Sequence, residues 1–201
     1  MIYHTIALRF ANRCVEPDAQ PGQKEIAVYG AELLISSAVE IIIVLTMGAV
    51  FHRLLETILF LMFFCPLRSV AGGYHAPGYR SCTLIFSSIF LIMILVLQPM
   101  PFWLQMLLLV ASSVSVWTLA PVEDFNKPLG KKRGQVLRRK SKYYLIVELI
   151  LYALTYISFS GKLFQTYLVC SFTAVSVLLF IGYIKNKTSD DRASEKGGPK
   201  G

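Results

Sequence analysis

A histidine and a cysteine lie seven residues apart in the most unusual segment of the chain, Pro66 to Cys82, which reads PLRSVAGGYHAPGYRSC. Its three glycines and internal proline forbid one continuous helix, so we expect His75 on a turn that folds back toward Cys82. Cys82 stands where an apolar run begins, and the free N–H groups and dipole at a helix start stabilise a thiolate. The pattern predicts a nucleophilic cysteine with His75 as its base, and an oxyanion site formed by backbone N–H groups near Ser81 to Thr83.

The same two residues also fit a structural interpretation. In it, His75 is an interfacial side chain and Cys82 is a small apolar residue at a helix end. The other cysteines, Cys14, Cys65 and Cys170, form no CxxC pair and none of the spacings typical of zinc sites or disulfide frameworks. Spacing alone leaves both interpretations of Cys82 open.

The composition is that of a membrane protein rather than a soluble domain. Of the 201 residues, 55% are hydrophobic and 16% are charged, and the charge is confined to short stretches. The net charge of +8 lies between apolar segments rather than on a nucleic-acid-binding motif, so no nucleic-acid partner is expected. Residues 1–27 show no secretory signal, and we expect the N-terminus to be retained.

Apolar segments of membrane length predict an all-α, polytopic fold with about six transmembrane helices. A short amphipathic helix is expected over residues 1–14, and the second and third spans are short for a bilayer about 30 Å thick, so an arrangement with four full spans is the alternative. One membrane domain is expected over residues 1–185, followed by a disordered tail over residues 186–201. The six spans are Val28–Val50, Leu54–Pro66, Thr83–Leu97, Phe102–Leu119, Tyr143–Phe159 and Phe164–Ile184.

The distribution of Lys and Arg predicts the orientation of these spans. The connections between successive spans lie alternately on the two sides of the membrane. The connections on one side contain only Arg53 and Lys162. The other 18 of the 20 Lys and Arg residues lie in the connections on the opposite side and at the two ends of the chain. Cytoplasmic loops carry the excess of positive charge. Both termini and the loop from Arg68 to Cys82 are therefore predicted to be cytoplasmic.

The string R-x-x-x-G-G-x-H-A-x-x-x-x-x-C, which runs from Arg68 to Cys82, resembles the signature loop of the accessory-gene-regulator B family. The pairs Ala120-Pro121 and Lys127-Pro128, the basic stretch that ends at Tyr144, the chain length and the order of the spans are also similar to that family. The loop motif is specific, because it combines several residue types in a fixed register.

The resemblance implies a cysteine endopeptidase of bacterial quorum sensing that lies in the cell membrane and needs no cofactor or metal. Its catalytic cysteine maps to Cys82 and its catalytic histidine to His75. The implied substrate is an AgrD-like propeptide with an amphipathic N-terminal segment and an acidic C-terminal tail. The enzyme would cleave off the tail through a thioester and promote closure of a thiolactone or lactone ring. Membrane lipids and a second copy of the chain, as a homodimer, are further expected partners.

A carboxylate that orients His75 is expected on the first span, where Tyr29, Glu32, Ser36 and Glu40 lie near one helical face. Carboxylates within a span are costly, which indicates function or pairing. Glu32 is the candidate, because it lies nearer the cytoplasmic end where His75 is also expected. An interfacial or Arg-paired carboxylate is the alternative interpretation of Glu32.

Cations near the loop are candidates for binding the acidic tail of the propeptide. The segment 120–142 carries eight Lys and Arg residues, which fit either an anchor beside anionic lipid or a docking surface for that tail. Arg68 also suits a role in bracing the loop. The candidate substrate-binding residues are Arg68, Arg80, Lys127, Lys131, Lys132 and Arg133.

A small membrane transporter or signalling protein without covalent chemistry is the competing class. Glu32, Glu40 and the Gly- and Pro-broken segments are typical of transporter interiors, although the sequence has no half-to-half repeat. A membrane metallopeptidase fits less well, because the sequence has no HExxH motif and its three histidines are too scattered to bind zinc.

The sided charge distribution makes a prediction about topology. Single cysteines placed near Gly130 are expected to react with an impermeant maleimide only from the cytoplasmic face, and single cysteines near Met100 only from outside. Labelling of both positions from the same side would rule out the six-span arrangement.

Overall fold

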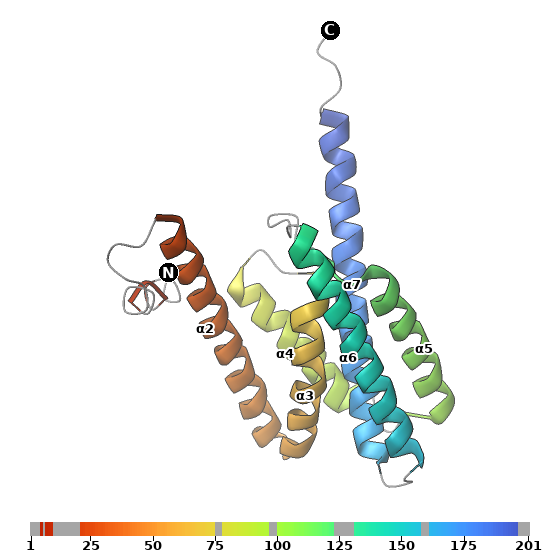
Figure 1. Cartoon of the computed structure of the whole chain (residues 1–201). Coiled ribbons are helices and arrows are strands. Elements are labelled where there is room, and N and C mark those ends of the chain that lie inside the picture. Colours follow the sequence, from red (N-terminus) through yellow and green to blue (C-terminus); the bar gives the residue numbers. More distant parts are fainter. Residues whose placement is uncertain are drawn as a thin grey trace.

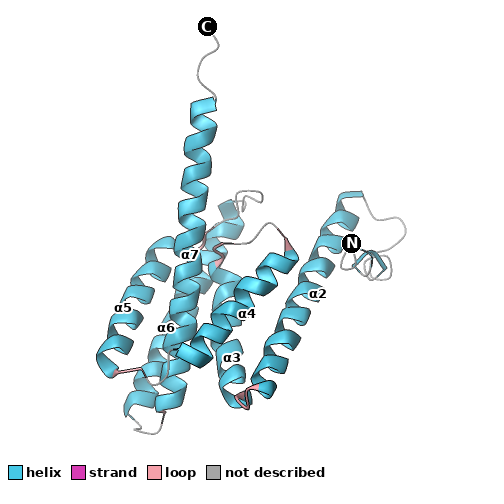
Figure 2. Ribbon diagram, turned by 180° about the vertical axis from the view of Figure 1, so that it is seen from behind, coloured by secondary structure: helices cyan, strands magenta, loops and turns pink. Residues whose placement is uncertain are grey.

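The computed structural model describes residue 5 and residues 7–9, 21–74, 78–96, 100–122, 131–157 and 161–196. This part of the chain forms a bundle of long helices, and α7 extends well beyond the others toward the C-terminus (Figures 1 and 2). The described residues contain no strand, only a single bridge between Gly72 and Val122, so the all-α prediction is confirmed for them. Most of the amphipathic helix predicted over residues 1–14 lies outside the described residues. The long helices are α2 (Pro21–Val50), α3 (Leu54–Ala71), α4 (Tyr79–Val96), α5 (Phe102–Leu119), α6 (Lys131–Ile157) and α7 (Lys162–Lys196).

Four of these helices are long and apolar enough to cross a membrane. Their apolar stretches are Gly30–Val50, Leu54–Ala71, Phe102–Leu119 and Lys162–Thr188. The apolar part of α4, Ser81–Leu95, is shorter, and α6 begins with a basic stretch. The six-span count therefore stays a prediction. The four long helices also differ from the four full spans of the alternative arrangement, because they include α3 and do not include α6.

Helix α3 is longer than the sequence analysis expected, because it does not end at Pro66. The proline lies inside the helix, which continues to Ala71. Proline removes one helical hydrogen bond, but burial of Leu67, Val70 and Ala71 holds the following turn in place. This extra turn carries Arg68 and brings the start of the Gly-rich loop into the bundle.

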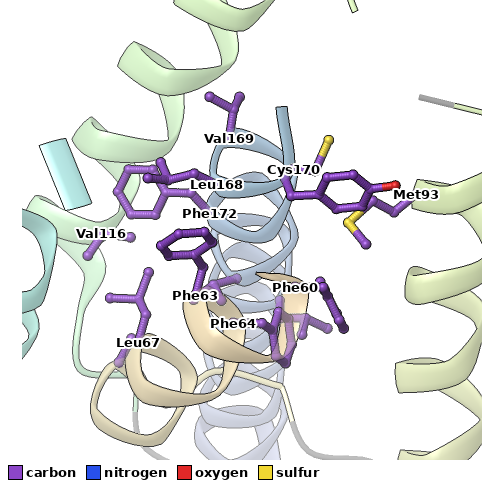
Figure 3. Packing of buried hydrophobic residues seen from close by; sticks show 14 of the residues in the cluster. Phe60, Phe63, Phe64, Leu67, Met93, Val116, Leu168, Val169, Cys170 and Phe172 are labelled. Atoms are coloured by element: carbon purple, nitrogen blue, oxygen red, sulfur yellow. The ribbon is translucent and has the colours of Figure 1, made fainter. Parts of the chain in front are cut away.

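The centre of the bundle is α7, which packs against both α3 and α5. The rings of Phe60, Phe63 and Phe64 on α3 lie against α7, whose Leu168 and Phe172 are fully buried (Figure 3). An aromatic cluster extends from α3 to α4 through Phe60, whose ring centroid lies 5.6 Å from that of Phe86 and 5.5 Å from that of Phe90, with the rings tilted in both pairs. Close packing of this kind drives helix association inside a membrane.

Two polar segments continue helices instead of forming a separate loop and tail. The basic stretch that the sequence analysis assigned to a loop is helical from Lys131, so it is the first part of α6. Helix α7 likewise continues to Lys196, although a disordered tail was expected from residue 186. Adding a residue to an existing helix costs much less than starting a new one, so polar sequence can follow an apolar span without leaving the helix.

Burial on α7 makes a prediction about stability. Phe172 is fully buried and Phe180 is 55% exposed, so the two phenylalanines form a matched pair on one helix. Phe172→Ala is expected to lower the free energy of unfolding in detergent by about 3 kcal/mol or more, and Phe180→Ala by less than about 0.5 kcal/mol. Equal shifts in the thermal midpoint of the two variants would contradict the placement of α7 at the centre of the bundle.

Candidate active site

Cys82 lies in the first turn of α4, half-buried, and faces a carboxylate on α2. Its thiol shares a hydrogen bond with the side chain of Glu40. The neighbouring Thr83 donates a hydrogen bond from Oγ1 to Oε1 of Glu40 at 3.5 Å. Two successive residues of α4 therefore contact the same carboxylate, which fixes the start of α4 against the middle of α2.

Arg68 comes from the last turn of α3 and joins this cluster to the Gly-rich loop. Its Nη2 donates a hydrogen bond to the backbone carbonyl of Tyr74. The guanidinium also lies close enough to interact electrostatically with both Cys82 and Glu40. Its Nη1 is buried and has no hydrogen-bond partner among the described residues. This N–H group is therefore available to an acceptor on the loop residues that follow Tyr74 or on a substrate.

The backbone of the loop is held at three successive residues. Gly72 and Gly73 have φ angles of +70° and +105°, which side-chain-bearing residues rarely adopt. The N–H of Gly73 donates to the carbonyl of Val122 at 3.1 Å, and the N–H of Tyr74 donates to the carbonyl of Leu178 on α7 at 2.8 Å. The chain is thus fixed up to Tyr74, the residue that precedes His75.

The surroundings of Cys82 favour its neutral thiol. Burial is the main cause that raises the pKa of this thiol to about 11, and the Glu40 carboxylate raises it further, whereas Arg68 lowers it. The sequence analysis expected the helix start to favour a thiolate. The difference comes first from the burial of Cys82 and then from the negative charge of Glu40, both of which oppose the effect of the helix dipole on the pKa of the thiol.

Of the residues predicted for catalysis, Cys82 is described in full and His75 lies outside the described residues. The pairing of His75 with Cys82 therefore stays a prediction. Glu32 is half-buried on α2, eight residues before Glu40, or about 12 Å along the helix axis. The carboxylate that the structure brings to Cys82 is Glu40. The sequence marked both Glu32 and Glu40 as carboxylates on the first span. It does not show that α4 begins beside the middle of α2, and this packing brings Glu40 to Cys82.

The predicted substrate-binding cations separate into two groups. Arg68 is beside Cys82, as described above. Lys132 and Arg133 are exposed in the first turn of α6. Lys127 lies outside the described residues, and the side chains of Arg80 and Lys131 are likewise not described.

Comparison with known proteins places the chain in a family. The sequence matches the family model described as accessory gene regulator B over residues 6–181. It is 32% identical to an AgrB-like protein 2 of Clostridium perfringens strain 13, over 67% of this chain and 69% of that protein. It is 30% identical to an AgrB-like protein of Clostridium perfringens strain SM101, over 84% of this chain and 86% of that protein. No solved structure matches the chain.

The contact between Glu40 and Cys82 predicts how the thiol reacts with a small alkylating reagent. In a chain whose other cysteines are replaced by alanine, the iodoacetamide rate of Cys82 should rise about tenfold per pH unit between pH 7 and 9, because the pKa of about 11 lies above this range. Glu40→Gln removes the negative charge, lowers the pKa of Cys82 and should increase the rate at pH 8 severalfold. Glu32→Gln is the control and should leave the rate unchanged. A larger effect of Glu32→Gln than of Glu40→Gln would contradict the described site.

Proposed function

The chain belongs to the accessory gene regulator B family, and from this premise we propose that it is a membrane-embedded cysteine endopeptidase that matures a quorum-sensing propeptide. The proposed substrate is an AgrD-like propeptide with an amphipathic N-terminal segment and an acidic C-terminal tail. The enzyme cleaves the peptide bond that precedes the tail and promotes cyclisation of the remaining peptide to a thiolactone or lactone.

In the proposed mechanism Cys82 is the nucleophile and His75 is its base. His75 takes the proton of the Cys82 thiol as the sulfur attacks the scissile carbonyl, and it gives this proton to the amine of the leaving tail. The product is a thioester between Cys82 and the peptide. A thiol or hydroxyl within the peptide then attacks the thioester, its proton passes to the Cys82 sulfur, and the ring is released. The site must favour this tethered nucleophile over water, by proximity and by exclusion of solvent.

The observation that carries the proposal is that Cys82 lies in the first turn of α4 and that Arg68 links it to the Gly-rich backbone that ends at Tyr74. Arg68 contacts both, since it lies close to the thiol and binds the carbonyl of Tyr74. Burial and Glu40 raise the pKa of the Cys82 thiol, so the proposal includes a base that acts during the attack, and His75 follows directly after the fixed residue Tyr74. This arrangement supports general-base activation of Cys82 rather than a preformed thiolate.

The acidic tail of the propeptide is proposed to bind to the cations at the start of α6 and to Arg68. The exposed Lys132 and Arg133 begin a basic stretch that continues along α6. The buried Nη1 of Arg68 is a donor closer to the scissile bond. Exposed charge pairs are screened by salt over about 8 to 10 Å, so the α6 contacts would serve capture of the substrate more than its alignment.

Replacement of single cysteines tests the proposal. Cys82→Ala is expected to abolish both tail cleavage and ring closure of a propeptide in membranes, because no acyl carrier remains. His75→Ala should lose cleavage as well, since an unassisted thiol is almost wholly protonated at pH 7. Both products are measured by mass spectrometry of the released peptides.

The matched controls are Cys14→Ala, Cys65→Ala and Cys170→Ala, which should retain most of the activity. Of these, Cys170 is buried against the core of the bundle and Cys65 lies within α3. Normal processing by the Cys82→Ala protein would refute the mechanism and favour a membrane transporter or signalling protein without covalent chemistry.

A further inference from the structure

Helix α7 presents one face to the Gly-rich loop, although about 100 residues of sequence separate them. The carbonyl of Leu178 accepts the hydrogen bond from the N–H of Tyr74 at 2.8 Å. The Nζ of Lys185 lies 5.0 Å from the centroid of the Tyr74 ring. Gly182 lies between these two contacts and is buried. The spacing i, i+4, i+7 puts all three residues on a single helical face.

Glycine is the only residue type that fits at position 182 on this face. A Cβ atom there would lie 2.6 Å from the backbone nitrogen of Tyr74 and 2.8 Å from the carbonyl carbon of Gly73. Both neighbours are backbone atoms, so neither can rotate away as a flexible side chain would. A Cβ on Gly73 would in turn lie 2.9 Å from the carbonyl oxygen of Leu178. The loop and the helix therefore meet through two glycines that face each other.

Packing of two helices does not explain this contact. Small residues on membrane helices commonly permit close approach of a second helix. The atoms that approach Gly182 belong instead to Gly73 and Tyr74, which lie outside any helix. Gly182 also lies one residue beyond the part of the chain that the family model matches. Its role follows from the geometry of the loop.

We propose that Gly182 is a positioning residue of the active site, because it lets the backbone of Gly73 and Tyr74 dock on α7 immediately before the proposed base His75. The proposal rests on the proposed function for its effect on catalysis. The docked backbone of Tyr74 is held from two sides, by the Leu178 carbonyl and by Arg68. An alanine at position 182 would displace Tyr74, and the displacement passes to His75, the next residue. A shift of about 1 Å in a catalytic group costs up to about a hundredfold in rate.

The test compares Gly182→Ala with Gly30→Ala, a matched control on α2. A Cβ on Gly30 would meet no atom within 4 Å, so this substitution is expected to be silent. Tail cleavage by Gly182→Ala should fall about tenfold to a hundredfold, while Gly30→Ala keeps the parent rate. Docking is measured separately, in a chain that carries Tyr74→Cys and has its four native cysteines replaced by alanine. Gly182→Ala should speed the reaction of this cysteine with a water-soluble maleimide severalfold, and Gly30→Ala should not.

A surface variant provides a second readout in case Gly182→Ala does not fold. Lys185→Gln removes the contact with the Tyr74 ring from an exposed position, and cleavage is expected to fall about two- to fivefold. If Gly182→Ala folds, activity equal to the parent for both variants would overturn the proposal, and if it does not fold, activity equal to the parent for Lys185→Gln would overturn it.

The labelling experiment separates the proposal from the proposed function. The labelled chain lacks Cys82, so its result does not depend on peptidase chemistry. Unchanged labelling with Gly182→Ala would overturn docking on α7, whatever the effect on cleavage. Two results together would support the docking contact and refute the enzymatic role. They are faster labelling of the Tyr74→Cys chain with Gly182→Ala, and normal processing of the propeptide by the Cys82→Ala protein.

Discussion

The structure depends on satisfying the backbone of an irregular segment inside a helical bundle. A non-helical segment at this depth has N–H and carbonyl groups that cannot all reach water, and each unsatisfied group is costly. The loop meets this requirement with partners from three parts of the chain. Val122 accepts from Gly73, Leu178 accepts from Tyr74, and Arg68 donates to the Tyr74 carbonyl. These hydrogen bonds fix the backbone of Gly73 and Tyr74, and the positive φ angles of Gly72 and Gly73 explain why both positions are glycine.

The same loop contacts explain why an ionisable cluster can exist in the bundle. Arg68 brings a positive charge next to the carboxylate of Glu40 and the thiol of Cys82, so the cluster is not an isolated buried charge. Glu40 and Arg68 act on the thiol in opposite directions, and burial together with Glu40 prevails in the resting protein. A neutral resting thiol is protected from alkylation and oxidation, which depend on the thiolate. In the proposed mechanism, the thiol reacts when the substrate and the base His75 are both in place.

The sequence predicted the local features of this site better than its long-range contacts. The apolar segments and the Gly-rich loop follow from hydropathy and from glycine and proline, so the all-α fold of the described residues and the place of Cys82 at a helix start were predicted correctly, whereas the bounds of α3, α6 and α7 were not. Glu32 was preferred to Glu40 because it lies nearer the cytoplasmic end of its span, and its role toward His75 stays a prediction. The contact of Glu40 with Cys82 depends on the packing of α4 against α2, which the sequence does not show. Gly182 gave no signal in the sequence, since a glycine within an apolar helix has many explanations. The helical course of the basic stretch was missed because a positively charged sequence is equally compatible with a loop.

The most direct measurement of the central claim is a search for the acyl intermediate on Cys82. A propeptide that lacks its internal thiol or hydroxyl cannot close the ring, so the thioester should accumulate on the enzyme. The account predicts an adduct of the cleaved peptide on Cys82, detected by mass spectrometry and released by hydroxylamine. An adduct on Cys65 or Cys170, or tail cleavage with no adduct under conditions that trap a thioester, would contradict it.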